Sequence, residues 1–529
     1  LDTEKINIVR NDNMSISKSL HHHNPYGVTA DVFPMYHEGK YHLFPGWVST
    51  IHNFECEQRL SDKFGHLSSE NILEWENHGP IIECKTVRDS RDSEGIGTGS
   101  FLVVDGVWHF FYCAFSNQQS DSINQTIYHA TSTDMVHWEE DPENPILMPD
   151  LKNFSGTDFR DPCVIWDENK QEYLMLIAAR TVSGPPIARG CIAQAHSKDL
   201  KKWELDETPF WAPGDSYVME CPQLFKLGKY WYLLYSRQYP QQKTVYVMSE
   251  TMYGPWKRPY PYEIENKRFY AAKIVDDGQR QFAFGWIWER DHESDDRPFI
   301  FGGDMALPHQ VVQCEDGRLQ FRCPDEIAEA YRDEECKVVF KNKADFSSGL
   351  PELKLGADNT ISGESDGLLC ASLYHENEKP FMIEAEFELS DEVEEAGFYL
   401  KCRDDLGKGH RIVVRPKEDC AILYRWPEKV DAGGTRGASD DSFGHEDDPQ
   451  QVDGFPPARV YIGLGEKRDS ARTINLKLFV TGSMVEAFID EKAALSYRIY
   501  DKKDGDTGIF VKGGKVKIKD LHIWETEEV

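Results

Sequence analysis

An aromatic strand pattern returns five times in the first 310 or so residues, and this internal repeat limits the folds open to the chain. Successive copies are 67, 65, 57 and 52 residues apart, and they begin at Tyr41, Trp108, Tyr173, Tyr230 and Phe282. Several copies follow a Gly or polar turn, as in Gly39-Lys40-Tyr41-His42-Leu43-Phe44. Alternation of this kind, rich in aromatic and β-branched residues, is typical of β-strands.

A second phrase recurs between these strands and ends each time on a tryptophan. It runs from Ser68 to Trp75, from Thr131 to Trp138 and from His196 to Trp203, and a weaker copy ends at Trp256. We interpret it as a polar turn before a packed Trp. A strand-only repeat of this length is typical of propeller blades. The sequence therefore predicts an all-β chain that begins with a five-bladed β-propeller. The alternative is a β-sandwich with chance Trp spacing, which the matching phrases disfavour.

The repeated aromatic and Trp patterns stop after Pro308, and a different pattern of alternating strands follows. We expect a catalytic propeller over residues 1–324, a short helical linker over 325–335 and a β-sandwich over 336–529. Residues 428–457 are polar, rich in Gly and Asp, and without periodicity, which predicts an exposed loop. The strands expected in the sandwich are 381–389, 397–402, 411–415, 459–464, 474–480, 484–489 and 508–511.

Composition excludes several classes of partner. Lys and Arg number 59 against 91 Asp and Glu, a formal net charge of −32, which disfavours binding to nucleic acid or anionic lipid. No apolar run approaches the roughly 20 residues of a membrane span. The twelve cysteines show no metal-ligand spacing, so we expect no metal and no cofactor. We expect a cytoplasmic protein, or a secreted one if a signal peptide has been removed, and leave a homo-oligomer open.

Three acidic motifs lead copies of the repeat: Ala30-Asp31-Val32-Phe33, Arg160-Asp161-Pro162 and Glu220-Cys221-Pro222. Because the innermost strand of each propeller blade lines the central channel, acids at equivalent places in the repeat are expected to converge. Taken alone, Asp31 reads as a turn residue at a strand start and Asp161 as an Asp-Pro turn. Glu220, by contrast, is flanked by apolar residues on a strand, where a lone carboxylate is unfavourable. Together the three predict a site that cleaves glycosidic bonds.

The ordered motifs resemble those of the glycoside hydrolase family 32 fructosidases, which group with families 68, 43 and 62. Arg160-Asp161-Pro162 is similar to the family's RDP motif and Glu220-Cys221-Pro222 to its EC motif. The resemblance continues through Thr98-Gly99-Ser100, Phe269-Tyr270-Ala271, Trp286 and the sandwich strands near residues 479–500. It implies a propeller followed by a sandwich. It also implies Asp31 as nucleophile, Glu220 as acid/base and Asp161 as a stabiliser of the transition state.

The resemblance further implies which residues bind the sugar. We expect substrate contacts from Arg160, Trp47, Ser100, Tyr270 and Trp286. The family's WMNDPNG motif is absent, and only Asp31 of it remains. The resemblance thus implies a retaining hydrolase of β-fructofuranosides, acting on sucrose-like sugars, fructo-oligosaccharides or fructans. Three alternatives stay open: a fructosyltransferase with the same acids, an inverting arabinofuranosidase or arabinanase, and a sugar-binding protein without catalysis.

Overall fold

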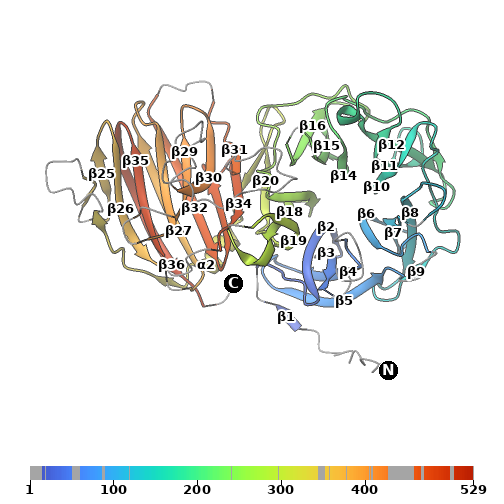
Figure 1. Cartoon of the computed structure of the whole chain (residues 1–529), viewed down its shortest axis with the longest axis horizontal. Coiled ribbons are helices and arrows are strands. Elements are labelled where there is room, and N and C mark those ends of the chain that lie inside the picture. The colour runs from blue at the N-terminus through green and yellow to red at the C-terminus, as the bar shows by residue number, and fades with distance from the viewer. Residues whose placement is uncertain are drawn as a thin grey trace.

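The molecule is all-β, with a ring of sheets followed by two sheets packed face to face (Figure 1). This computed structural model describes residues 15–17, 20–50, 60–85, 90–117, 119–239, 241–295, 297–342, 352–356, 358–376, 378–403, 406, 409–426, 458–465, 470–500 and 505–527. The loop expected over 428–457 lies outside the described residues. Within these ranges, no helix is both long enough and apolar enough to cross a membrane.

The described residues between Gly27 and Gln313 form five successive antiparallel units, and Figure 1 shows them around a common centre. The units are β2 (Gly27–His37), β3 (Lys40–Ser49), β4 (Lys63–Ser69) and β5 (Trp75–Glu83); β6 (Gly95–Val104), β7 (Val107–Phe115), β8 (Gln125–Ser132) and β9 (Glu139–Glu140); β10 (Phe154–Asp167), β11 (Glu172–Thr181), β12 (Gly190–Ser197) and β13 (Glu204–Leu205); β14 (Met219–Leu227), β15 (Tyr230–Arg237) and β16 (Lys243–Ser249); and β17 (Phe269–Asp276), β18 (Gln281–Arg290), β19 (Phe299–Met305) and β20 (His309–Gln313). The five predicted aromatic strands are confirmed as β3, β7, β11, β15 and β18.

The first and last units of the ring are joined through their strands. Strand β2 pairs with β19 at Thr29 and Gly303, so the two units form one ten-stranded sheet. This sheet also holds β1 (Ser15–Ser17) on β5 and β21 (Leu319–Arg322) on β20. Short 3₁₀ turns, η1 (Pro186–Ala188) and η2 (Asp291–Glu293), lie in the connections. The beginning and end of the ring are therefore held together by backbone hydrogen bonds.

The recurring Trp phrase folds into the same turn in three units. The residue three positions before the Trp has a positive φ in each case: 60° at Ile72, 61° at Met135 and 63° at Leu200. The carbonyl of that residue accepts a hydrogen bond from the indole of Trp75 at 3.1 Å, of Trp138 at 3.0 Å and of Trp203 at 3.2 Å. An Asn or Asp side chain accepts from the following amides, which is the local bonding these residues favour in turns.

Each unit begins with a strand that carries a β-bulge near its middle. The register shifts lie between Thr29 and Val32, Gly97 and Gly99, Arg160 and Cys163, Glu220 and Gln223, and Tyr270 and Lys273. A bulge places two residues opposite one and turns a side chain away from the regular alternation. Positive φ values at Asp161 (58°), Cys221 (51°) and Ala271 (50°) mark the distorted residues. The predicted acids therefore lie where the strands bend.

Two sheets form the C-terminal part, and both contribute to one apolar core. One sheet contains β22 (Glu334–Glu335), β24 (Lys354–Leu355), β25 (Ile361–Glu364), β27 (Phe381–Leu389), β32 (Arg472–Thr481), β33 (Met484–Ile489), β34 (Ala493–Arg498) and β36 (Lys515–Glu525). The other contains β23 (Lys341–Asn342), β26 (Leu368–His375), β28 (Glu395–Cys402), β29 (Gly409–Arg415), β30 (Cys420–Trp426), β31 (Ala458–Tyr461) and β35 (Asp506–Lys512). All seven strands predicted here are present, and the helical segment is α2 (Asp325–Tyr331).

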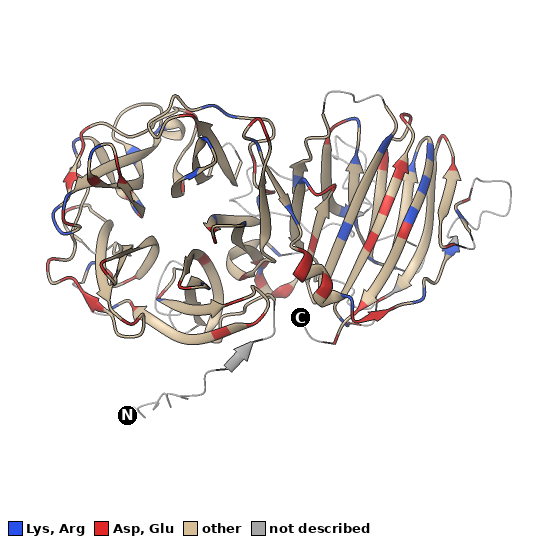
Figure 2. Ribbon diagram, turned by 180° about the vertical axis from the view of Figure 1, so that it is seen from behind, with Lys and Arg blue, Asp and Glu red and all other residues tan. Residues whose placement is uncertain are grey.

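The outer face of the first of these sheets is covered by charges of both signs. Glu386 pairs in register with Lys519 and Glu388 with Lys517, across β27 and β36. Figure 2 shows acidic and basic residues alternating over this sheet. Opposite charges on neighbouring strands attract, and a charged face stays in water. The other face of the sheet is free to pack on its partner, where Phe387 meets Phe398 at 5.6 Å.

A buried polar chain joins the ring to the C-terminal sheets. Glu486 on β33 accepts from the Leu307 amide at 2.9 Å and bonds His21 at 2.5 Å. Glu265 lies within 2.7 Å of His309, and the Ser496 hydroxyl is shared by the two glutamates at 2.9 and 3.4 Å. Buried charged groups need such partners, and removing one partner leaves the others unsatisfied. This buried hydrogen-bond network therefore fixes how the ring packs against the C-terminal sheets.

We expect Glu486→Ala to destabilise the protein by about 3 kcal/mol or more, because it leaves buried partners without their acceptor. The measurement is the midpoint of urea unfolding. Glu364→Ala is the matched control, since Glu364 forms an exposed pair with Lys515 at 3.3 Å, and such pairs contribute less than about 1 kcal/mol. Equal midpoints for the two variants would show that this buried hydrogen-bond network does not hold the ring and the C-terminal sheets together.

Candidate active site

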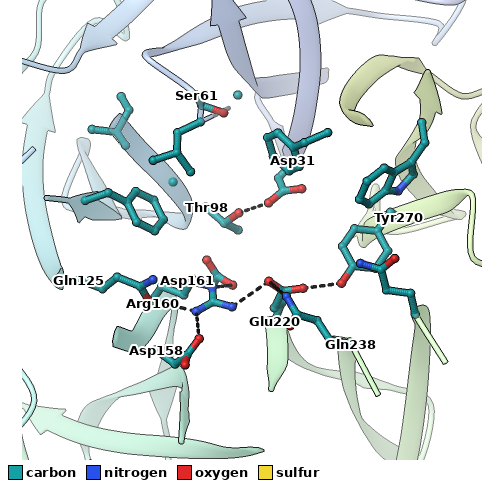
Figure 3. A pocket seen from close by; sticks show the side chains of 18 of the residues that line it. Asp31, Ser61, Thr98, Gln125, Asp158, Arg160, Asp161, Glu220, Gln238 and Tyr270 are labelled. Atoms are coloured by element: carbon teal, nitrogen blue, oxygen red, sulfur yellow. Dashed lines mark hydrogen bonds and ion pairs between the residues drawn. The ribbon is translucent and has the colours of Figure 1, made fainter. Parts of the chain in front are cut away.

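A cavity of about 680 Å³ lies where the bulged strands of the ring meet. Its described lining comes entirely from residues between 31 and 301 and includes the three predicted acids. Asp31 comes from β2, Asp161 from β10 and Glu220 from β14. Figure 3 shows these side chains pointing toward one another from separate strands. The sequence repeat thus brings together carboxylates that are up to 189 residues apart in the chain.

Both oxygens of the Asp31 carboxylate are held by neighbouring units. The Trp286 indole of β18 donates to Oδ1 at 2.9 Å, and the Thr98 hydroxyl of β6 donates to Oδ2 at 2.5 Å. The Cys221 thiol lies 3.6 Å from the same Oδ2. Hydrogen bonds to a carboxylate fix its direction. Asp31 is therefore oriented while remaining part of the cavity lining.

Glu220 receives three donors on its two oxygens. Arg160 Nη2 donates to Oε1 at 2.8 Å, and Gln238 Nε2 donates to the same oxygen at 2.9 Å. The Tyr270 hydroxyl donates to Oε2. Burial and the neighbouring Glu220 raise the pKa of Tyr270 well above its ordinary value, so this hydroxyl stays protonated. Glu220 therefore lies in the cavity with its carboxyl plane set by three side chains.

Asp161 is the most deeply buried of the three acids, at 3% exposure. The Cys221 backbone amide donates to its Oδ2 at 2.8 Å, and Arg160 Nε lies 3.8 Å away. Burial raises the pKa of Asp161 to about 7; Arg160 opposes this shift, while the charges of Glu220 and Asp31 add to it. The protonation of Asp161 is therefore sensitive to pH near neutrality.

Arg160 is the cation of this cluster. It bonds Asp158 at 2.8 Å as well as Glu220, and it is 8% exposed. Burial opposes the charge, but Glu220, Asp158 and Asp161 outweigh it and raise the pKa of Arg160 above its ordinary value. The guanidinium therefore stays ionised among the carboxylates.

Cys221 contributes packing and not a nucleophile. Burial, with the charges of Asp31 and Asp161, raises the pKa of its thiol well above the ordinary value, so the reactive thiolate is suppressed. Throughout the described ranges, no group of three or more His, Cys, Asp or Glu side chains is placed to hold a metal ion. The cavity itself holds the carboxyl groups of Asp31, Asp161 and Glu220, which can act as paired acids and bases.

Comparison with known families agrees with this arrangement over most of the chain. The sequence model described as "Glycosyl hydrolases family 32 N-terminal domain" matches residues 25–322, and that of "Glycosyl hydrolases family 32 C terminal" matches residues 354–525. The chain belongs to glycosyl hydrolase family 32. It is a glycosidase by that membership.

Curated relatives and solved structures of family 32 are similar to nearly the whole chain. Raffinose invertase of Escherichia coli is 23% identical over 93% of this chain and 90% of its own length. Sucrose-6-phosphate hydrolase of Escherichia coli is 24% identical over 92% of this chain and 94% of its own. The structure of fructan 1-exohydrolase IIa from Cichorium intybus has a TM-score of 0.68 at 16% identity and covers 98% of both chains.

Three of the five residues expected to bind substrate, Trp47, Ser100 and Trp286, are not among the described residues that line the cavity. Trp47 is fully buried and packs against Tyr26 with ring centres 5.5 Å apart. The Ser100 hydroxyl accepts the Val164 amide at 3.0 Å, which ties β6 to β10. Arg160 and Tyr270 line the cavity, and Trp286 reaches it through Asp31. Trp47 and Ser100 therefore lie beside the cavity and not in its described lining, and their contact with substrate stays a prediction.

Several lining residues carried no site assignment in the sequence. Thr98 belongs to the Thr98-Gly99-Ser100 motif. The motif predicted a residue near the site, but it did not show that the Thr98 hydroxyl would bond Asp31. Asp158 lies two residues before Arg160 and bonds it, a spacing that could have pointed to it. Gln125 begins β8 and Gln238 follows β15, and neither had a signal, because a lone Gln at the end of a strand is common.

We expect Asp161→Asn to lower activity and to raise stability at pH 8. The Asp161 carboxyl group binds its proton more tightly in the folded protein than in the unfolded chain. Its protonation therefore stabilises the folded state fully below pH 3.8, and this stabilisation is lost as the pH rises to about 7. The loss of stability on ionisation is at most about 4 kcal/mol, and an Asn side chain, which does not ionise, does not incur it.

The measurement is urea unfolding of both proteins at pH 8 and near pH 4.5. The advantage of Asp161→Asn should shrink at the lower pH. Asp276→Asn, on an exposed part of β17, is the control and should change stability little at either pH. An Asp161→Asn variant that is less stable than the native protein at pH 8 would contradict this account.

Proposed function

We propose that this protein hydrolyses β-fructofuranosidic bonds in sucrose-like sugars, fructo-oligosaccharides or fructans with retention of configuration. The observation that carries the proposal is the meeting of Asp31, Asp161 and Glu220 in one cavity, each held by its own donors. The names of the family 32 relatives, an invertase and a sucrose-6-phosphate hydrolase, support the same bond type.

In the proposed reaction, Asp31 attacks the anomeric carbon while Glu220 gives a proton to the departing oxygen. This forms a covalent fructosyl-enzyme on Asp31 and releases the other sugar as an alcohol. Glu220 then takes a proton from water, which attacks the same carbon and frees Asp31. The bonds from Trp286 and Thr98 keep the Asp31 carboxylate in line for attack.

Asp161 and Arg160 are proposed to serve the sugar ring. Asp161 accepts hydrogen bonds from ring hydroxyls, which strengthen as the anomeric carbon gains positive charge. Arg160 holds Glu220 in place through its Nη2. Because Tyr270 stays protonated, it keeps a donor on the second Glu220 oxygen. These contacts give the acid and the nucleophile separate supports.

We also propose the domain organisation that this function uses. The five units of residues 1–324 form a five-bladed β-propeller, residues 325–335 a linker, and residues 336–529 a β-sandwich. The ring seen in Figure 1, the β2–β19 pairing and the α2 boundaries support this division. The sandwich supplies no described residue to the cavity lining. Its role is therefore structural in this proposal.

The two catalytic acids should respond differently to removal of their charge or proton. Asp31→Asn loses the attacking group and should lose turnover of both sucrose and an aryl β-fructofuranoside. Glu220→Gln loses the proton donor and should lose about 10²–10⁴-fold on sucrose, yet keep part of the first step on the aryl substrate. An aryl leaving group needs little protonation.

Added azide separates the two roles further. It should restore turnover to Glu220→Gln on the aryl substrate, by capturing the fructosyl-enzyme without base assistance, and give a fructosyl azide of retained configuration. It should not restore Asp31→Asn. Asp276→Asn is the matched control and should keep normal rates on both substrates. Near-normal sucrose hydrolysis by Asp31→Asn would place the nucleophile elsewhere.

A further inference from the structure

An exposed tyrosine, Tyr217, lies just before the strand that carries the proposed acid. It precedes Glu220 by three residues, and three residues of chain span at most about 11 Å. Its side chain is 36% exposed, although its neighbours Ser216 and Val218 are buried. A single exposed aromatic residue is common on protein surfaces, so its surroundings decide whether it can bind a ligand.

The side chain of Tyr217 is held in one orientation by Arg180. The guanidinium carbon lies 3.9 Å from the centre of the Tyr217 ring, and Nη1 donates to the Tyr217 hydroxyl at 3.0 Å. Arg180 is itself anchored, because it donates to Asp158 at 3.2 Å and to the Pro186 carbonyl at 2.8 Å. One face of the ring is thus covered. Since the tyrosine oxygen accepts from Arg180, its own hydrogen is available to a ligand.

The backbone on both sides of Tyr217 is held as well. The Gly190 amide donates to the Ser216 carbonyl at 2.8 Å. The Gln238 amide donates to the Val218 carbonyl at 3.3 Å. A Cβ on Gly190 would lie 2.6 Å from the Ser216 carbonyl oxygen, so a larger residue there would push this segment away. Tyr217 is therefore fixed through its ring, its hydroxyl and its backbone, which lowers the entropy lost when a ligand binds.

These contacts place Tyr217 beside the mouth of the cavity. Asp158 and Gln238, which anchor it from two directions, both line the cavity. Figure 3 shows them with Glu220 between them in this view. In the proposed reaction Glu220 gives a proton to the departing oxygen, so the departing sugar lies on the Glu220 side of the bond. Tyr217 therefore adjoins the space that this sugar would occupy.

We propose that Tyr217 binds the leaving sugar, with the ring face opposite Arg180 against sugar C–H groups and the phenol hydrogen on a sugar hydroxyl. The inference rests on the proposed function and adds a subsite for the leaving group of the same reaction. Tyrosine suits this role because it combines an apolar ring with a polar tip. These contacts exist before the bond breaks, so they lower KM and leave kcat nearly as it is.

The experiment compares sucrose with methyl β-D-fructofuranoside, whose leaving group, methanol, is too small to reach Tyr217. Tyr217→Ala should lower kcat/KM for sucrose by about 10-fold, mainly through KM, and change that for the methyl fructoside by less than about 2-fold. Tyr217→Phe keeps the ring and should lose only about 3-fold on sucrose. An equal loss on both substrates, or no loss on sucrose, would overturn the inference.

Tyr253→Ala is the matched control. Tyr253 is 41% exposed, its hydroxyl donates to Asp167 at 2.5 Å, and Lys170 lies over its ring at 4.8 Å. It therefore has similar surroundings, but Asp167 is the last residue of β10, seven positions beyond Arg160. Tyr253→Ala should change kcat/KM for both substrates by less than about 2-fold. A loss confined to sucrose and as large as that of Tyr217→Ala would refute the placement of the subsite.

Failure of the proposed function gives a different result. In that case the native protein would cleave none of sucrose, methyl β-D-fructofuranoside and the fructan trisaccharide 1-kestose, and the inference would fall with the function. If the native protein prefers 1-kestose, whose leaving group is sucrose, that sugar takes the place of sucrose in the comparison. Cleavage by the native protein with unchanged kinetics in Tyr217→Ala would leave the function standing and remove only the subsite.

Discussion

The Arg160 guanidinium allows four carboxyl groups to lie in one cavity. It contacts Asp158 and Glu220 at 2.8 Å and Asp161 at 3.8 Å, and it is nearly buried. Without a cation in this position, buried carboxylates would repel one another and take up protons. Even with Arg160 present, burial raises the pKa of Asp161 to about 7. Arg160 thus offsets part of the negative charge of the site, while burial of the Asp161 carboxyl group lowers the free energy of unfolding.

The bulges in five strands allow several side chains to point into the same cavity. A regular strand alternates its side chains between faces, so neighbouring residues cannot both be aimed at one point. The bulges at Asp161 and at Cys221 break that alternation, and the Cys221 amide becomes a donor to the Asp161 carboxylate. Each unit of the ring carries this distortion at the corresponding place. The function depends on a repeated departure from ideal strand geometry.

The sequence predicted the repeat better than the surroundings of the site. Tyr41 and its four counterparts could be placed on strands because alternation and the Trp turn are local signals. Short strands such as β24 and β25 lacked that signal, and β26, β30 and β36 were also missed. The positions of Trp47 and Ser100 could not be predicted, because whether a Trp faces a cavity or the core depends on residues far away in the chain. Trp47 is packed where Gly65 leaves room for its ring, whose atoms would lie 2.3 Å from an added Cβ.

The C-terminal sheets reach the site indirectly, through the wall of the cavity. Phe299 lines the cavity and packs against Tyr497 of β34 with ring centres 5.7 Å apart. Arg290 of β18 donates to the same Tyr497 at 3.0 Å. Since Trp286 of β18 also holds Asp31, movement of this strand would displace the proposed nucleophile. The second part of the chain therefore stabilises the strand on which the proposed reaction depends.

A covalent bond between the sugar and Asp31 is the central step of the proposed reaction. An aryl β-fructofuranoside mixed with Glu220→Gln, quenched in acid within one turnover and digested with pepsin, should yield a peptide that contains residue 31 and is heavier by one fructosyl group in mass spectrometry. A fructosyl group on a peptide that contains residue 161 instead, or rapid turnover with no labelled peptide, would contradict the assignment of Asp31 as nucleophile.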